Sequence, residues 1–225
     1  MVDDPVSTPT FEEAGLRVEA ARYALLRRIA PALRHEAVGH LQPIAMVTSV
    51  LERRLEMPEP DVAQLRDGVR RLASSSRNGL QACLDVIGWL SADAGDAVPL
   101  EQAVRESLDL LKGSLGFRGF SLREDVAGAR HPVERTAMRQ VLPACLLWLT
   151  DHAGPPAQVT VGLGRTPRGA MALVLSLEPT EGEAGSPHEP ACRALSLDEV
   201  RALAEAEGLR VQHEGDQLTL ELPPA

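Results

Sequence analysis

Residues 33–55 read LRHEAVGHLQPIAMVTSVLERRL, and this stretch decides the fold of the N-terminal part. Its apolar side chains recur every three or four residues, which is the spacing of one face of an α-helix. A second stretch of the same kind runs from Asp61 to Ser91, after the turn residues Met57-Pro58-Glu59-Pro60. Two long helices joined by a short connection predict an antiparallel hairpin. The apolar positions are Leu33, Ala37, Leu41, Ile44, Thr48, Leu51 and Leu55 in the first helix, and Leu65, Val69, Leu72, Leu80, Cys83, Ile87 and Leu90 in the second.

The first helix is predicted to begin well before residue 33. Thr10 and Glu13 have the spacing of a capping box, in which each side chain binds the other residue's backbone N–H. Pro31 and Pro43 each remove a backbone donor, so we expect a kink at both. Two helices alone cannot bury both apolar faces. We therefore expect a homodimer whose two hairpins form a four-helix bundle.

The sequence pattern changes after residue 90. Residues 91–98 read SADAGDAV and predict a linker between residues 1–92, the hairpin domain, and residues 98–225, a second domain. The predicted fold class is α+β, with helices on one face of a mixed sheet in the second domain. The elements expected there are helices at 100–112, 133–152 and 196–208, strands at 120–124, 158–163, 170–177, 209–213 and 217–222, and a loop at 178–194.

Composition and charge exclude several functional classes. The chain has 225 residues, of which 44% are hydrophobic, and carries a net charge of −9. A negative protein without a basic, aromatic-rich stripe is not expected to bind nucleic acid. No apolar run approaches the roughly 20 residues that cross a bilayer, and the acidic start fits no signal peptide. Cys83, Cys145 and Cys192 are scattered, which predicts reduced thiols and a cytoplasmic location.

A zinc site is one interpretation of residues 34–40, RHEAVGH. Zinc proteases place two histidines four residues apart, so that both rings point from one helical face. His35 and His40 are five apart and diverge by roughly 140° around a helix. The two rings therefore cannot bind the same metal ion, and we expect no metal site.

The same segment resembles another kind of site. Residues 33–44, LRHEAVGHLQPI, are similar to the phosphoacceptor box of bacterial histidine kinases and histidine phosphotransferases, with the sporulation phosphotransferases as the nearest variant. The resemblance implies that His35 is the phosphorylated histidine and Glu36 its acidic neighbour. Gly39 departs from the family, which often has Asn or Thr there, and this departure puts phosphatase activity in doubt.

Helical geometry supports the same histidine independently. His35 lies roughly 165° from the apolar seam and is expected to face solvent, whereas His40 lies about 55° from it and is expected to border the core. A neutral imidazole is a competent nucleophile near neutral pH, and Glu36 could orient the ring or accept its proton. Arg34, Arg28 and His40 are the candidate partner-binding residues. The alternative is that His35 and Glu36 form an ordinary solvated helix face.

The second domain resembles the ATP-binding domain of histidine kinases at residues 98–111, at the strand near Phe120, and at Arg139-Gln-Val-Leu142. The family's two asparagines, one of which holds magnesium, correspond to Ala144 and Trp148. Glu178-Pro-Thr-Glu-Gly182 stands where the family has Asp-x-Gly-x-Gly, and the later phosphate-binding glycines are missing between Pro187 and Ser196. We therefore expect no bound ATP and no cofactor of the chain's own.

These features predict a histidine-containing phosphotransfer protein that passes a phosphoryl group between response-regulator receiver domains. The resemblance implies that the receiver supplies the magnesium, and that a hybrid histidine kinase is a further possible partner. One alternative is a non-catalytic pseudokinase that binds and regulates, or scaffolds, a histidine kinase or a receiver. Another is an active kinase with an unusual ATP site.

Overall fold

The computed structural model of the chain describes residues 11–90, 96–183, 185 and 192–224. These residues divide into two compact units. Residues 30–90 form the helical unit, and residues 11–29 together with 96–224 form the sheet unit. The sequence pattern predicts residues 11–29 as part of the hairpin domain, but they belong to the sheet unit, in which Ala21, Ala24, Leu25 and Ile29 are buried.

Helix α1 (Phe11–Leu55) is the long helix predicted around residues 33–55, and it continues through Pro31 and Pro43. The capping residue expected at Thr10 lies outside the described residues. Helix α2 (Val62–Leu90) follows the predicted turn. Asp61 begins it, because its carboxylate accepts hydrogen bonds from the N–H groups of Ala63 (2.8 Å) and Gln64 (3.2 Å).

The helical unit is an antiparallel hairpin, as predicted. Leu33 and Leu51 of α1 are buried, and α2 meets α1 through residues that are mostly small. At Gly79, an added Cβ would lie 3.0 Å from Leu41 Cδ2 and 3.2 Å from Ile44 Cδ1. The close approach of the two helices therefore depends on the missing side chain of Gly79. The buried residues of α2 are Gly68, Gly79, Ala82 and Trp89.

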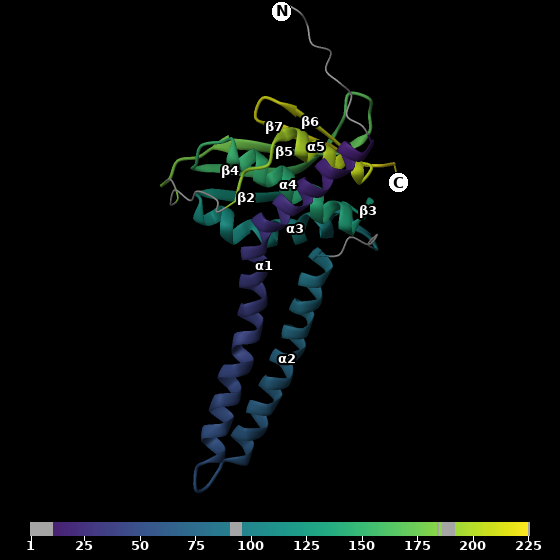
Figure 1. The fold of residues 1–225 in the computed structure, drawn as a ribbon. Helices are drawn as coiled ribbons and strands as arrows, with labels where there is room; N and C mark the ends of the chain where they lie inside the picture. The colour runs from purple at the N-terminus through teal and green to yellow at the C-terminus, as the bar shows by residue number, and fades with distance from the viewer. Residues whose placement is uncertain (1–10, 91–95, 184, 186–191, 225) are drawn as a thin grey trace, which may run out of the picture. The chain divides into compact units, whose positions relative to one another are not determined.

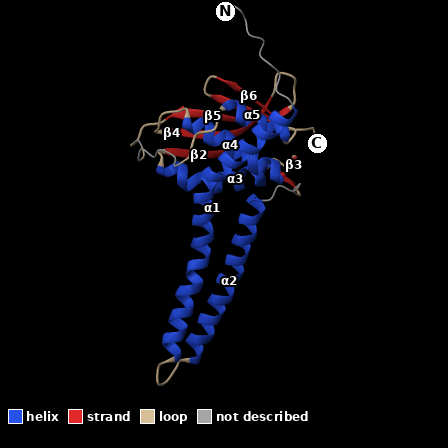
Figure 2. Cartoon of the chain, viewed as in Figure 1, coloured by secondary structure: helices blue, strands red, loops and turns tan. Residues whose placement is uncertain are grey.

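The sheet unit contains a five-stranded mixed sheet of order β2-β4-β5-β7-β6 (Figures 1 and 2). β2 pairs with β4 in parallel, and the other three pairings are antiparallel. Along β4, Ala157, Val159 and Val161 are buried and alternate with partly exposed residues, so one face of the sheet forms the core. The strands are β2 (Phe120–Asp125), β4 (Ala157–Arg165), β5 (Met171–Pro179), β6 (Arg210–Glu214) and β7 (Gln217–Glu221).

Helices α3 (Leu100–Phe117), α4 (Arg135–Asp151) and α5 (Leu197–Ala206) complete this core and pack against one another in that order. The capping box predicted at Ser196 and Glu199 is present in both directions. The α+β fold class, with a helical N-terminal region and a mixed sheet after it, is confirmed.

Two short strands depart from the prediction. β1 (Ala97–Pro99) and β3 (Pro132–Glu134) form a separate antiparallel pair. The linker predicted at residues 91–98 therefore ends in a strand, and residues 91–95 lie outside the described residues. The helix expected from Val133 begins at Arg135, because the Glu134 carboxylate accepts a hydrogen bond from Ala137 N–H (2.8 Å) and acts as the N-cap.

Candidate functional site

His35 is exposed on α1, which confirms the predicted solvent-facing position. It lies 16 residues before Leu51, which is buried against α2. At about 100° per residue this separation turns the side chain roughly 160° away from α2. The ring therefore points out of the hairpin, where another protein can reach it.

The position of His35 along the hairpin follows from the helix contacts. Gly68 lies against Leu51, and Gly79 lies against Leu41 and Ile44. Because the two helices are antiparallel, this register places His35 level with Leu84 on α2. Along the hairpin, the histidine therefore lies far from the turn that joins the two helices.

Three other predicted residues of this segment are exposed: Arg34, Glu36 and His40. Glu36 adjoins His35 in the chain, and both side chains reach solvent. The expectation that His40 borders the core is wrong for this chain. The side chains of Leu41 and Ile44 close over Gly79, and the carbonyl oxygen of His40 is its atom nearest to that contact.

Arg28 has a different environment. Its guanidinium binds Asp151 in the sheet unit through two hydrogen bonds of 2.7 and 2.9 Å, and the two side chains are 5% and 7% exposed. Arg118 binds the same carboxylate at 2.9 Å and the Thr150 carbonyl oxygen at 3.0 Å. The structure therefore places the head group of Arg28 in a buried network rather than beside His35.

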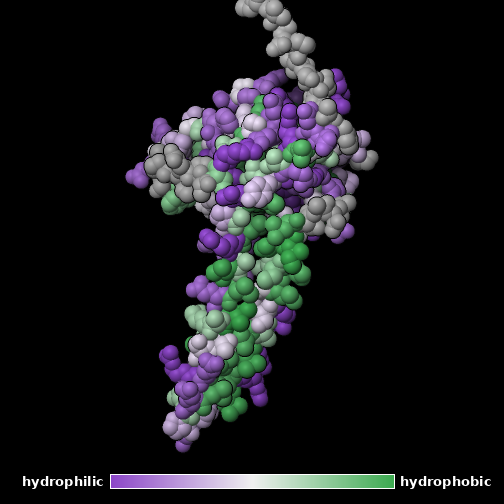
Figure 3. Space-filling model, viewed as in Figure 1, coloured by the Kyte–Doolittle hydropathy of each residue, from purple (hydrophilic) through white to green (hydrophobic). Residues whose placement is uncertain are grey.

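An apolar stripe remains exposed on the hairpin. Figure 3 shows hydrophobic residues running along the visible side of both helices. On α2 the stripe follows the spacing of one helix face, and Leu80, Leu84 and Ile87 are between 51% and 62% exposed. An exposed apolar stripe of this kind is typical of a surface that contacts another protein, a membrane or a ligand. Its members are Val38, Leu41, Val62, Val69, Leu80, Leu84 and Ile87.

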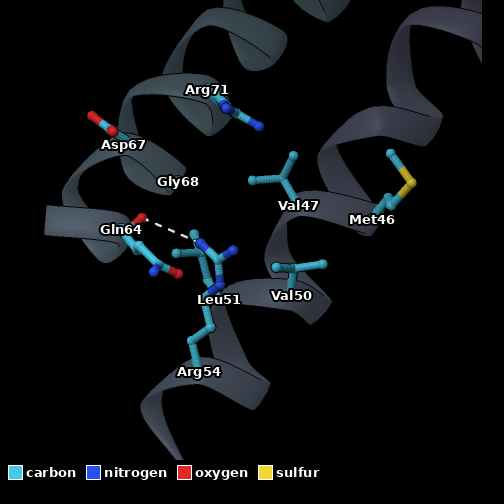
Figure 4. Close-up of a pocket in the computed structure, with 9 residues that line it drawn as sticks. All are labelled: Met46, Val47, Val50, Leu51, Arg54, Gln64, Asp67, Gly68 and Arg71. Atoms are coloured by element: carbon cyan, nitrogen blue, oxygen red, sulfur yellow. Dashed lines mark hydrogen bonds between the residues drawn. The ribbon is translucent and has the colours of Figure 1, made fainter. Parts of the chain in front are cut away.

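A groove of about 300 Å³ lies on another side of the hairpin (Figure 4). Met46 and Val50 line one wall, and helical geometry places Met46 within about 20° of His35 around α1. Arg54 closes the groove toward the turn, with its Nη1 near the Gln64 carbonyl oxygen at 3.5 Å. The groove therefore extends from the α2 contact at Leu51 toward the side of α1 that carries His35. The other lining residues are Val47, Leu51, Gln64, Asp67, Gly68 and Arg71.

In the sheet unit, the two positions compared with magnesium-binding asparagines are both in α4. Ala144 is completely buried and Trp148 is 6% exposed. The indole of Trp148 contacts the rings of His152 and His213, at centroid distances of 4.5 and 4.8 Å. Neither position presents an amide oxygen, so neither offers the ligand that the family uses.

The loop after β5 also departs from a phosphate site. Thr180 stands where close backbone approach needs glycine, and its N–H donates to the Pro156 carbonyl oxygen (3.0 Å). Glu178, Glu181 and Glu183 are exposed around it, and three carboxylates repel a triphosphate. Half of the segment from Pro187 to Ser196, residues 187–191, lies outside the described residues.

Sequence reasoning missed the groove and the Asp151 network. Met46 and Val50 do not belong to the apolar seam, and they give no signal until α2 is placed beside them. Arg28 and Asp151 are 123 residues apart, so no local pattern pairs them.

Two further observations concern metals and membranes. Across the described parts of the chain, no group of three or more His, Cys, Asp or Glu side chains is arranged to hold a metal ion. Among the helices described here, none combines the length and the hydrophobicity that a membrane span requires.

No protein family and no curated protein matches the chain in sequence. Its arrangement is similar to those of several solved histidine kinases. A histidine kinase from Burkholderia phymatum STM815 is 13% identical, with 95% of this chain and 97% of that chain covered and a TM-score of 0.42. The histidine kinase AdeS of Acinetobacter baumannii is 14% identical over 78% of this chain and 94% of that chain, with a TM-score of 0.42. The histidine kinase ThkA, in a complex with the response regulator TrrA, is 16% identical over 99% of this chain and 68% of that chain, with a TM-score of 0.39.

Proposed function

We propose that the chain is a histidine-containing phosphotransfer protein that carries a phosphoryl group between response-regulator receiver domains in the cytoplasm. The observation that supports this most is the exposed His35, which points away from α2 and adjoins Glu36. A hairpin carrying an outward histidine provides a positioned nucleophile, which is the main requirement of such a protein.

The transfer proceeds by attack of an unprotonated imidazole nitrogen of His35 on the phosphorus of an aspartyl phosphate. An N–P bond forms as the P–O bond to the aspartate breaks, and the bonding electron pair leaves with the carboxylate. The other ring nitrogen then loses its proton to Glu36 or to water, which leaves a neutral phosphorylated ring. Transfer to a second receiver reverses these steps.

The receiver brings the magnesium ion that this transfer needs, and the chain itself uses no nucleotide. The buried Ala144 and the carboxylates around Thr180 support this division of labour. The groove of Figure 4 supports docking as well, because Met46 on its wall faces the same direction as His35 and because Arg54 and Arg71 line it. Acidic receiver surfaces would find cations there, with Arg34 beside the histidine.

A second copy of the chain covers the apolar stripe in this proposal. Two stripes, each containing Leu80, Leu84 and Ile87, would form the interior of a four-helix bundle. Around α1, His35 lies 60° from Val38 and 120° from Leu41, the two stripe residues of that helix, so it stands beside the stripe and remains accessible at the edge of such a bundle. The homodimer explains why so much apolar surface is exposed on one chain.

Incubation with a receiver phosphorylated by a small phosphodonor tests the proposal. The label is expected to move from the receiver to the chain, and the His35→Ala variant is expected to take none. Glu52→Ala is the matched control, because Glu52 is also exposed on α1 but lies outside the stripe and the groove, and it should accept the label. The proposal fails if no receiver of a broad panel transfers, or if His35→Ala is labelled as well as the unaltered chain.

A regulatory binding module is the alternative function. The exposed stripe and the groove would serve it equally, because both are docking surfaces without chemistry. In that case His35→Ala would keep both the binding and the regulation of a histidine kinase or receiver. Measurement of partner binding beside phosphotransfer distinguishes the two functions.

A further inference from the structure

Helix α4 is buried on almost every side. Fourteen of its 17 residues are buried, including residues on the side away from the sheet. A helix that packs on one face of a sheet ordinarily leaves its outer side in solvent. Another part of the chain must therefore cover that side.

The covered side of α4 is defined by four residues spaced four, three and four apart: Gln140, Ala144, Leu147 and Asp151. This spacing places them on one helix face, which we name the α4 outer face. Ala144 is 0% exposed and Leu147 is 4% exposed. The face therefore has a small apolar centre with a polar residue at each end.

The first part of α1 lies on this face (Figure 1). Its arginines hold both ends. Arg22 donates to Gln140 (2.9 Å), and Arg28 binds Asp151. Four apolar residues on the same part of the helix are between 0% and 6% exposed: Ala21, Ala24, Leu25 and Ile29. Because the helix is fixed at both ends of the outer face, its apolar residues lie over Ala144 and Leu147.

The two surfaces are chemically complementary. The helix carries arginines at two points six residues apart, and the face supplies Asp151 to Arg28 and the neutral Gln140 to Arg22. At the other end Arg22 also reaches Glu207, just after α5, at 2.7 Å. The α4 outer face is thus shaped for a cationic amphipathic helix.

We propose that the α4 outer face is a helix-binding surface that residues 21–29 of the same chain occupy, and that this occupant keeps nucleotides off the face. Ala144 is the position that the resemblance compares with a magnesium-binding asparagine, and the occupying helix covers it. The second part of the proposal rests on the ATP-independence stated under Proposed function, whereas the occupancy itself does not.

A release variant, Arg22→Ala together with Arg28→Ala, is designed to loosen α1 without unfolding the sheet unit. Removing Arg28 leaves Asp151 bound to Arg118, so no carboxylate is buried alone. Removing Arg22 leaves Glu207, whose side chain is 14% exposed, just after the end of α5. Arg17→Ala is the control, because Arg17 is exposed on the same helix.

The first measurement is fluorescence anisotropy with a labelled peptide of residues 15–31. The full-length release variant is expected to bind this peptide at least tenfold more tightly than the unaltered chain or Arg17→Ala, whose surfaces are already filled. A peptide in which both arginines are changed to alanine should bind none of these three proteins. Equal binding to all three proteins, or no binding to the release variant while it melts cooperatively, would overturn the occupancy.

Hydrogen exchange supplies the second measurement and covers the case in which the release variant does not fold. Residues 21–29 should exchange slowly in the unaltered chain, faster in Arg22→Glu, and slowly again in Arg22→Glu with Glu207→Arg, because the pair is restored with reversed charges. Failure of that rescue contradicts the proposed contact. Millimolar magnesium-ATP should leave exchange unchanged in residues 21–29 and in α4, and a change at either would contradict nucleotide exclusion. Neither result depends on transfer to His35.

Discussion

Glu199 begins α5 and combines two interactions in one carboxylate. It binds Arg193 at 2.5 and 2.7 Å and completes the capping box with Ser196 (2.9 Å). The hydrogen bond from Arg193, followed by those from Ser196, lowers the pKa of Glu199 to about 2. The charged form is therefore bound more strongly in the folded chain than in the unfolded one.

Glu199→Gln should reduce the free energy of unfolding of the sheet unit at pH 7. Arg193 is 56% exposed, so solvent screens the pair and we expect a loss of about 1 kcal/mol. Because the pKa of Glu199 is lower in the folded chain, its carboxylate stabilises the folded state fully above the unfolded value near 4.5. This stabilisation is lost as the pH falls toward 2. Denaturant melts at several pH values should thus show a difference that shrinks below about pH 4.5 and disappears near pH 2. Glu205→Gln on the same helix is the control, and a difference independent of pH would contradict the account.

Cys145 offers a second test at this scale. It is completely buried in α4, and burial raises the pKa of its thiol to about 12. Because the thiolate is the reactive form, N-ethylmaleimide should modify Cys192 in the native chain and leave Cys145 unmodified. Peptide mass spectrometry checks this, with the denatured chain as the reference in which both react. Native Cys145 reacting as fast as Cys192 would show that α4 is not packed as described.

The position of a single residue can be predicted from the sequence where the periodicity of its own helix determines that position. His35 could be placed in solvent because its angle to the apolar seam follows from helix geometry. Arg28 could not be placed, because its partner Asp151 is 123 residues away and only the folded chain brings them together. The prediction that His40 borders the core was wrong, because angles around a single helix do not include the packing of the second helix at Gly79.

At the scale of elements, two glycines flank the C-terminal end of α3 and have opposite roles. Gly113 lies inside the helix, is exposed, and has open space where a Cβ would stand. Gly119 follows the helix with φ +90, and an added Cβ would lie 2.6 Å from Gly185 N. The first glycine only weakens the helix, whereas the second permits the turn into β2.

Gly113→Ala should therefore stabilise the sheet unit by up to about 1 kcal/mol, since alanine restricts the unfolded chain and favours helix. Gly119→Ala should destabilise it by more than that amount, because the backbone conformation and the space both oppose a side chain. Thermal melts of the two variants check the contrast. Stabilisation by both substitutions would contradict the turn geometry.

The long elements could be predicted from sequence, and the shortest could not. Helical and strand periods need several residues to show, so the three-residue strands β1 and β3 gave no signal. The apolar seam of α2 could be read from the sequence, but the sequence did not reveal that small residues such as Gly68 and Gly79 make the contact with α1. Leucines at 80 and 84 are left exposed, which is what the expected second copy would cover.

On the scale of the whole molecule, the exposed stripe predicts association. The unaltered chain should sediment as two copies, with a mass of twice 24.2 kDa. The double variant Leu84→Lys, Ile87→Lys should be monomeric. The free energy needed to bury the lysine charges in a bundle exceeds the free energy gained from the contact between two copies. Arg70→Ala, an exposed change outside the stripe, should leave the dimer intact. Monomeric behaviour of the unaltered chain at micromolar concentration would remove the four-helix bundle from the account.

The division into two units was predictable only in part, because the sequence shows a continuous helix from residue 11 to 55 and no boundary at residue 29. Pairing of α1 with α4 is a long-range event that no local pattern marks. The candidate site lies on the helical unit. The central proposal for this site is chemical, namely that His35 becomes phosphorylated.

The most direct test maps the phosphoryl group itself. The chain is incubated with a phosphorylated receiver, digested at mildly alkaline pH, where phosphohistidine survives, and sequenced by mass spectrometry. The account predicts one acid-labile phosphoryl group, on His35 and absent from His40. Phosphate found on another residue, or no phosphate on a chain that demonstrably binds the receiver, would contradict it.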